Sequence, residues 1–196
     1  MILEKTIVRT IPVSKAVAMW NLIDHEHLDV VHGNYKEAHV LFEKEGYFVS
    51  VYKVKLPFIP FLYIKSPVFG VVPDENTYIN YFFQFGIDSK LTYKFKELKK
   101  DYTKIKVKYQ FNLTGIKLIF YPLLKFMISK WNEGVWLEDL PVKIRRQKVL
   151  RMGFKDFHGL PDKIEDRFYN GPLKYEMPVK RPRYSSRDRH PFKINR

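Results

Sequence analysis

Alternating hydrophobic and polar residues run through the greater part of the chain, from its first residues to about Leu113. Segments of this kind, rich in β-branched and aromatic residues, are typical of strands. The predicted strands are Leu3–Ile11, Glu37–Lys44, Tyr47–Leu56, Phe61–Val72, Thr77–Phe85, Lys90–Leu98 and Thr103–Leu113. Within the last one, the string KIKVKYQF sends lysines to one face and Ile, Val and Tyr to the other. An antiparallel sheet with one wet and one dry face follows.

Two segments between the first and second strands have helical spacing instead. Ser14 is a suitable N-cap for a helix through Trp20 and Ile23. A second short helical stretch is predicted at His25–Val31, ended by Gly33.

After Gly115 the apolar residues again recur at the spacing of a helix. A helix bent at Pro122 is predicted over Ile116–Trp131. A break at Asn132–Gly134 and a second helix at about Leu140–Met152 are expected to follow.

This order of elements predicts an α+β fold, in which a curved antiparallel sheet wraps around the long C-terminal helix and encloses an apolar cavity. The 196 residues suffice for one sizeable core, and the aromatic share of 16% suits the lining of a cavity. We expect one domain over residues 1–160 and an irregular basic tail over residues 161–196.

Composition excludes several kinds of chemistry. The chain has no cysteine, so it has no disulfide, no thiolate nucleophile and no Cys-ligated iron–sulfur cluster of its own. Met1–Thr10 does not read as a signal peptide, which favours the cytoplasm. The most apolar run, Leu118–Ile128, is too short for a transmembrane segment and contains Lys125.

The formal net charge of +14 is spread unevenly, because Met177–Arg196 holds seven basic residues and one acid, Asp188, and so carries +6 of it. We interpret this segment as a solvated basic tail. The alternative is a docking segment for an acidic partner protein or nucleic acid. Nucleic acid is the less favoured partner, since no zinc finger, helix-turn-helix or aromatic RNA-binding pattern accompanies the charge.

The densest group of chemically useful residues reads N-x-x-D-x-x-H-x-x-x-x-H, from Asn21 through Asp24 and His27 to His32. Two histidines and a distant carboxylate, Asp139, have the composition of a facial triad for Fe(II), which leaves coordination positions open for O₂ and substrate. Histidines five residues apart lie about 140° apart around a helix, so the chain is expected to unwind near Asp29–Val31. In the alternative interpretation, Asp139 only caps a helix that starts at Leu140.

The element order and the string VSKAVAMWNLIDHEHL resemble the helix-grip superfamily, which includes START lipid-transfer domains, polyketide cyclases and birch-pollen-type allergens. The resemblance covers about Leu3–Met152. It implies that a hydrophobic small molecule is held between the sheet and the long helix.

A narrower resemblance is to the catalytic domains of Rieske-type ring-hydroxylating oxygenases, whose iron site looks like this pattern. It implies that His27, His32 and Asp139 are the ligands of Fe(II). It also implies that Asp24 orients a ligand histidine and relays electrons, and that the Asn21 amide lies close to the iron. Those oxygenases carry a separate Rieske domain that this cysteine-free chain lacks, so its electrons would come from another protein.

Three functional hypotheses remain after this comparison. The first is a non-haem Fe(II) oxygenase that acts on an aromatic or alicyclic substrate. The second is binding or transfer of a hydrophobic ligand without chemistry. The third is an interaction protein whose basic tail docks a partner, and it is compatible with the first. An oligomer is compatible with all three.

Overall fold

In the computed structural model of the chain, the described residues are 1–44, 46–56, 59–84 and 86–152. Seven strands of this part form one antiparallel sheet, in the order β1-β7-β6-β5-β4-β3-β2. The strands are β1 (Ile2–Ile11), β2 (Tyr35–Lys44), β3 (Tyr47–Leu56), β4 (Ile59–Asp74), β5 (Thr77–Gln84), β6 (Ile87–Lys99) and β7 (Tyr102–Asn112). All seven predicted strands are present. The predicted tail at 161–196 lies outside the described residues.

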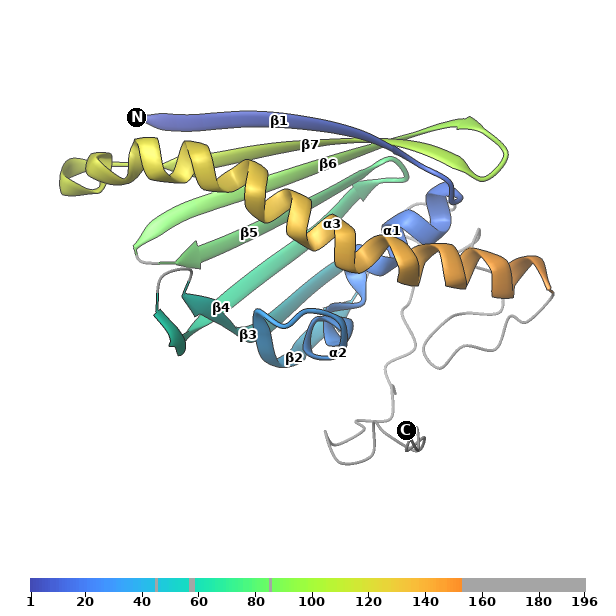
Figure 1. Cartoon of the computed structure of the whole chain (residues 1–196), viewed down its shortest axis with the longest axis horizontal. Coiled ribbons are helices and arrows are strands. Elements are labelled where there is room, and N and C mark those ends of the chain that lie inside the picture. The colour runs from blue at the N-terminus through green and yellow to red at the C-terminus, as the bar shows by residue number, and fades with distance from the viewer. Residues whose placement is uncertain (45, 57–58, 85, 153–196) are drawn as a thin grey trace.

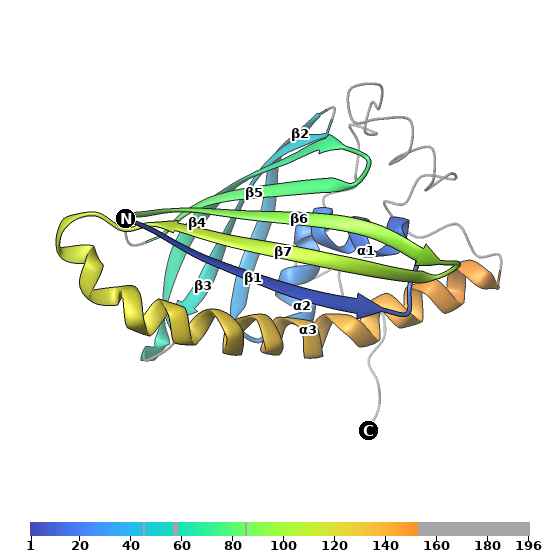
Figure 2. The same cartoon turned by 90° about the horizontal axis from the view of Figure 1, so that it is seen from above.

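The alternation along β7 confirms the expected wet and dry faces. Its buried side chains are Ile105, Val107, Tyr109 and Phe111, while the intervening lysines point away from the core. β1 pairs with β7 along its whole length, from Ile2 opposite Asn112 to Ile11 opposite Thr103. The first and last strands are therefore neighbours, and the sheet as a whole is curved (Figures 1 and 2).

The helices lie on the concave side of this sheet. After β1 come α1 (Lys15–Ile23), the 3₁₀ turn η1 (His25–His27) and the single-turn helix α2 (Leu28–Val31). After β7 come the 3₁₀ segment η2 (Gly115–Phe120) and the long helix α3 (Tyr121–Arg151). Figure 2 shows α3 running along the sheet from one end to beyond the other. The predicted α+β helix-grip fold is confirmed.

The start of α1 is as predicted from its sequence. Ser14 is the N-cap, and its hydroxyl accepts a hydrogen bond from the backbone N–H of Val17 at 3.4 Å. Almost every residue of α1 is buried, including Val17, Met19 and Trp20, because the helix is enclosed by the sheet and by α3. A helix that is apolar on all sides is stable only in such a position.

The predicted break at Asn132–Gly134 is wrong, because α3 is one unbroken helix of 31 residues that includes this segment. Pro122 lies in the first turn of α3, where a missing N–H costs nothing, so it starts the helix rather than bending it. Gly134 disfavours a helix by only about 1 kcal/mol. Burial of the flanking side chains outweighs that cost.

The buried face of α3 is a single stripe at intervals of three and four residues: Ile128, Asn132, Trp136, Asp139, Lys143 and Gln147. Most of this stripe is polar, which is unusual for the face that a helix turns toward a core. Among the described residues, no helix is both long enough and apolar enough to cross a bilayer.

Candidate functional site

The histidine segment sits between α1 and the sheet and changes conformation three times. The backbone N–H of Asp24 donates to Trp20 and ends α1, after which His25–His27 form the 3₁₀ turn and Leu28–Val31 a single α-helical turn. His32 is extended, with φ −107° and ψ 118°. We expected the chain to unwind near Asp29–Val31, but those residues are helical. The helix is interrupted before Leu28, by the 3₁₀ turn, and ends at His32. Both irregularities turn the two imidazoles toward α3.

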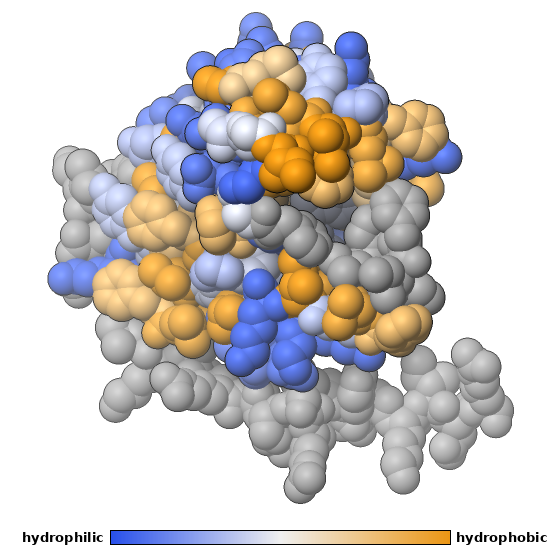
Figure 3. Space-filling model, turned by 90° about the vertical axis from the view of Figure 1, so that its left-hand side faces the viewer, coloured by the Kyte–Doolittle hydropathy of each residue, from blue (hydrophilic) through white to orange (hydrophobic). Residues whose placement is uncertain are grey.

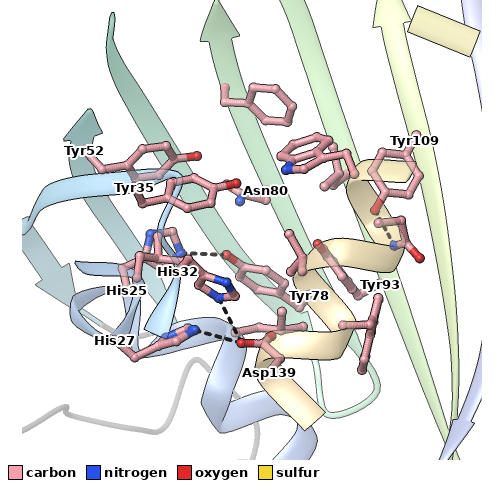
Figure 4. A pocket seen from close by; sticks show the side chains of 18 residues that line it. His25, His27, His32, Tyr35, Tyr52, Tyr78, Asn80, Tyr93, Tyr109 and Asp139 are labelled. Atoms are coloured by element: carbon pink, nitrogen blue, oxygen red, sulfur yellow. Dashed lines mark hydrogen bonds and ion pairs between the residues drawn. The ribbon is translucent and has the colours of Figure 1, made fainter. Parts of the chain in front are cut away.

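The structure brings His27, His32 and Asp139 together. Asp139 Oδ1 lies 2.9 Å from His32 Nε2 and 3.3 Å from His27 Nε2, and the three ligand atoms lie within 4.8 Å of one another (Figure 4). Asp139 is only 3% exposed and belongs to the middle of α3. The alternative interpretation of Asp139 as a helix cap is therefore excluded.

The two separations between the Asp139 carboxylate and the imidazoles, 2.9 and 3.3 Å, suit a transition-metal ion. With metal–ligand bonds of about 2.1 Å, adjacent ligands of an octahedral or tetrahedral ion lie about 3 to 3.5 Å apart. Within the described part of the chain, His32 Nε2 and Asp139 Oδ1 are both buried and neither makes a hydrogen bond of normal geometry. Two buried polar atoms that face one another without such a bond are what a cation between them would satisfy.

The other nitrogen of each imidazole is fixed by a neighbour. His27 Nδ1 contacts the backbone carbonyl of Asp24, and His32 Nδ1 lies 2.5 Å from Glu138 Oε2. In the neutral imidazole, an Nδ1–H that donates to an oxygen leaves the Nε2 lone pair free. Both Nε2 atoms are therefore presented to the common centre, in the manner of ligands oriented by a second layer of contacts.

Lys143 supports Asp139 from the opposite side. Its Nζ donates to Asp139 Oδ2 at 2.7 Å, and the lysine is fully buried one helical turn after the aspartate. The ammonium also lies 4.4 Å from the centroid of the Trp136 ring. Oδ2 is thus occupied by Lys143, and Oδ1 is the oxygen left to face the histidines.

Charge and burial act against one another at this centre. Burial raises the pKa of Asp139, but the two histidines and the Lys143 charge outweigh it, so that this pKa lies well below its usual range. Burial lowers the pKa of His32, and the carboxylates of Asp139 and Glu138 reverse this and raise it. The aspartate is ionised at neutral pH, as a metal ligand must be.

The structure places the two remaining predicted residues beside the cluster. The Asn21 side chain is fully buried, with its Nδ2 3.4 Å from His27 Nε2, close to the centre as the resemblance implies. The Asp24 carboxylate faces Arg146, at 3.9 Å, while its backbone carbonyl is the group that contacts His27. The electron-relay role of Asp24 stays a prediction.

His25 is buried beside the cluster and does not belong to it. Its ring nitrogens lie 2.8 Å from Ser50 Oγ and 3.1 Å from the Tyr78 hydroxyl. Burial lowers the pKa of His25 to about 3, so the ring is neutral. His39, by contrast, is exposed, and His158 lies outside the described residues.

A pocket of about 90 Å³ joins these groups. Around it stand the three histidines, Asp139 and five tyrosines: Tyr35, Tyr52, Tyr78, Tyr93 and Tyr109. Burial raises the pKa of Tyr52 and of Tyr109 to about 12, and it raises the pKa of the other three hydroxyls well above its usual range. All five are therefore neutral hydrogen-bonding groups at physiological pH.

A second, larger cavity of about 610 Å³ adjoins the pocket. It lies between the first turns of α3 and the strands, and its lining is mainly apolar, with Ile87, Phe111 and Met127 among its residues. Phe82 and Trp131 line both cavities, so these two side chains form the partition between them.

Glu138 and Lys143 also belong to the site, although the sequence pattern did not indicate a role for them there. Lys143 follows Asp139 by four residues, the spacing of neighbours on one helix face. This spacing indicates a contact only when both residues lie in the same helix. The predicted helix started at Leu140 and left Asp139 outside it, so the pair was not recognised.

Neither a family model nor a curated protein sequence matches this chain. Solved structures do match it. The aromatase/cyclase ZhuI from Streptomyces is 10% identical, with a TM-score of 0.59 over 76% of this chain and 95% of that one. Human STARD10 is 15% identical, with a TM-score of 0.56 over 76% of this chain and 68% of that one. A START superfamily protein from Mycobacterium smegmatis is 13% identical, with a TM-score of 0.51 over 76% and 98%. At such identities the likeness is one of fold.

Proposed function

We propose that this chain binds an apolar small molecule between its sheet and α3 and holds a divalent metal ion, Fe(II), at the polar end of that space. The observation that carries the metal is the convergence of His27 Nε2, His32 Nε2 and Asp139 Oδ1 within 4.8 Å, two of them buried and lacking a normal hydrogen bond among the described residues. Two imidazoles and one carboxylate are the donor set preferred by non-haem Fe(II).

The finer proposal is an oxygenase-like reaction on an aromatic or alicyclic substrate. A bound Fe(II) with open coordination positions supplies a place for O₂ beside the substrate. The chain's own residues would orient the ligand imidazoles through Glu138 and the Asp24 carbonyl, and hold Asp139 through Lys143. The apolar walls would exclude water. Because the sequence has no cysteine for a cluster, electrons would come from a separate donor protein.

Metal analysis after anaerobic loading with Fe(II) tests the centre. We expect about one equivalent of iron in the wild-type protein and less than about a tenth in the variants His27→Ala, His32→Ala and Asp139→Ala, since removal of one of three ligands abolishes such a site. His39→Ala is the matched control, because His39 is an exposed histidine outside the cluster. Equal iron in the ligand variants and in the control would remove the metal from the proposal.

The second candidate function is binding or transfer of a hydrophobic ligand without chemistry. The apolar cavity of about 610 Å³, far larger than the space beside the histidines, favours it. The fold likeness to START proteins supports it as well. Mass spectrometry of molecules extracted from the native protein distinguishes the two candidates. Binding that persists in chelator and in His32→Ala favours the second, whereas loss of binding under either condition favours the first.

A further inference from the structure

One end of the molecule, where α3 begins, gathers apolar side chains at its surface. The end of β3, the start of β4, the end of β5, the start of β6, η2 and the start of α3 all lie at this end (Figures 1 and 2). β4 extends beyond β5 at this end, because the pairing of these two strands starts only at Val68, opposite Phe82. Figure 3 looks onto this end and shows hydrophobic residues above and below its middle, with hydrophilic residues around them.

The exposed apolar residues at this end are large. Phe61 is 84% exposed and Phe83 52%, at the ends of β4 and β5. Ile116 is 80%, Ile119 66% and Phe126 60% exposed, on η2 and the first turns of α3. Single exposed apolar residues are ordinary on a protein, but a gathered set marks a surface that another body covers. We call these five residues the apolar end face.

The charge around the apolar end face is mainly positive, although Asp88 lies opposite Phe83 in the pairing of β5 with β6 and Glu37 pairs with Lys53. The two segments that build most of it, residues 47–72 and 115–131, contain no aspartate or glutamate. Their charged residues are the lysines Lys53, Lys55, Lys65, Lys117, Lys125 and Lys130. Lys117 is held against this end by its contact with the carbonyl of Gly86, in the β5–β6 turn. Such a surface complements a negatively charged one.

The larger cavity reaches the apolar end face. Phe126, at 60% exposure, and the neighbouring Leu123, at 37%, belong to the cavity lining as well as to the surface. Lys55 and Lys130 stand at the same lining. The cavity is thus continuous with the apolar end face through Phe126, and Leu123 beside it lines the same cavity.

We propose that the apolar end face docks onto an anionic lipid bilayer, with its Ile and Phe side chains entering the headgroup boundary and its lysines contacting lipid phosphate and carboxylate groups. Protruding apolar side chains with lysines around them are the features by which a protein lies on such a membrane. The cavity then opens toward the bilayer, which is where apolar ligands are dissolved. This inference goes beyond the proposed metal centre and does not depend on it.

Co-sedimentation of the full chain with vesicles tests the docking. We expect the wild-type protein to bind vesicles of phosphatidylcholine with about one third phosphatidylserine and to bind pure phosphatidylcholine weakly. The double variant Ile116→Asp/Ile119→Asp should lose at least about tenfold in partitioning, because two inserted side chains become charged. Lys125→Gln and Lys130→Gln should each lose roughly fivefold at low salt.

The matched control is Val8→Asp/Leu98→Asp, which adds the same charge at residues of 50% and 51% exposure away from the apolar end face. It should partition within about twofold of the wild type. Binding by the basic C-terminal tail alone would leave the Ile116/Ile119 variant at the wild-type level, and that result would overturn the proposal. A dimer seen by analytical ultracentrifugation that the same variant abolishes, without vesicle binding by the wild type, would overturn it in favour of a second copy of the chain.

Discussion

The two adjoining cavities of this protein differ in almost every physical property. The smaller, of about 90 Å³, is surrounded by three histidines, Asp139 and five tyrosine hydroxyls, each held by hydrogen bonds or burial. The larger, of about 610 Å³, is walled mainly by aliphatic and aromatic side chains and reaches the surface. One space has groups that do chemistry but little room, and the other has room but few such groups.

This difference restricts the ligand. A volume of about 90 Å³ accommodates only a few non-hydrogen atoms, so the body of a ligand lies in the larger cavity and one end of it passes Phe82 and Trp131. An elongated apolar molecule with one reactive or polar end fits this division.

Asp139→Ala is expected to have the largest effect, because it leaves Lys143 as a buried charge without its partner. Breaking a buried pair on one side costs about 3–5 kcal/mol of unfolding free energy. Asp139→Ala/Lys143→Met should recover most of this stability in urea denaturation and still bind no iron. If the double variant recovered stability and iron together, Asp139 would not be a ligand. If it recovered neither, the ion pair would not be what Asp139 contributes to the fold.

The tyrosines predict a loss of stability at alkaline pH. In the unfolded chain a tyrosine has a pKa of about 10, whereas in the folded protein burial raises the pKa of Tyr52 and Tyr109 to about 12. A raised pKa means that the folded state retains the proton longer. Its stabilisation is complete below pH 10 and is lost as the pH rises toward 12.

The size of the loss is about 1.4 kcal/mol for each pH unit above 10 and for each of these tyrosines. Urea denaturation at about pH 9 and 11 measures it, with tyrosinate absorbance as the second readout. Tyr109→Phe should reduce the difference between the two pH values by roughly one tyrosine's share. A stability that is constant across this range would show that the hydroxyls are accessible to solvent.

Much of this arrangement was accessible from the sequence, and the reason differs from one residue to the next. The strands, their turns and the Ser14 cap follow from local patterns that the packing leaves intact. His27, His32 and Asp139 converge as the spacing and the resemblance led us to expect. The Fe(II) itself, and the relay role of Asp24, stay predictions.

Two features of the site could not be predicted from local sequence, because contacts between distant segments determine them. Asn132 and Gly134 predict a helix break, but Asn132 hydrogen-bonds the Tyr109 hydroxyl at 2.6 Å and Arg9, so the sheet holds the helix through that point. Only a continuous helix aligns Asp139 with Lys143. Likewise nothing in the string DHEHLDVVH marks His25 as buried, because its partners Ser50 and Tyr78 come from distant strands.

Trp131→Ala tests the partition between the cavities, with an expected cost of about 2 kcal/mol in stability because the side chain is only partly buried. The two spaces should merge, and apolar fluorescent probes that the wild type admits only to the larger cavity should then reach the histidines. Quenching of such a probe by Co(II) bound at the cluster measures this access. Trp131→Phe, which keeps an aromatic ring in the partition, is the control. Quenching that is as strong in the wild type would mean that the partition is open already.

Glu138→Gln is expected to have the smallest effect on the fold, and it tests most directly whether the pocket and the larger cavity act separately. Glu138 is about 40% exposed at its side chain, so its loss should change unfolding stability by no more than about 0.5 kcal/mol. Its contact with His32 Nδ1, at 2.5 Å, nevertheless sets which nitrogen of that imidazole faces the centre. Loss of such an orienting carboxylate typically lowers metal affinity by about tenfold or more.

Titration of the metal-free protein with Co(II), followed by its visible absorption, measures that affinity. Probe binding in the larger cavity should not change, since Glu138 does not line it. A parallel loss of both would mean that the pocket and the larger cavity act as one site, and that the physical division between them has no functional counterpart.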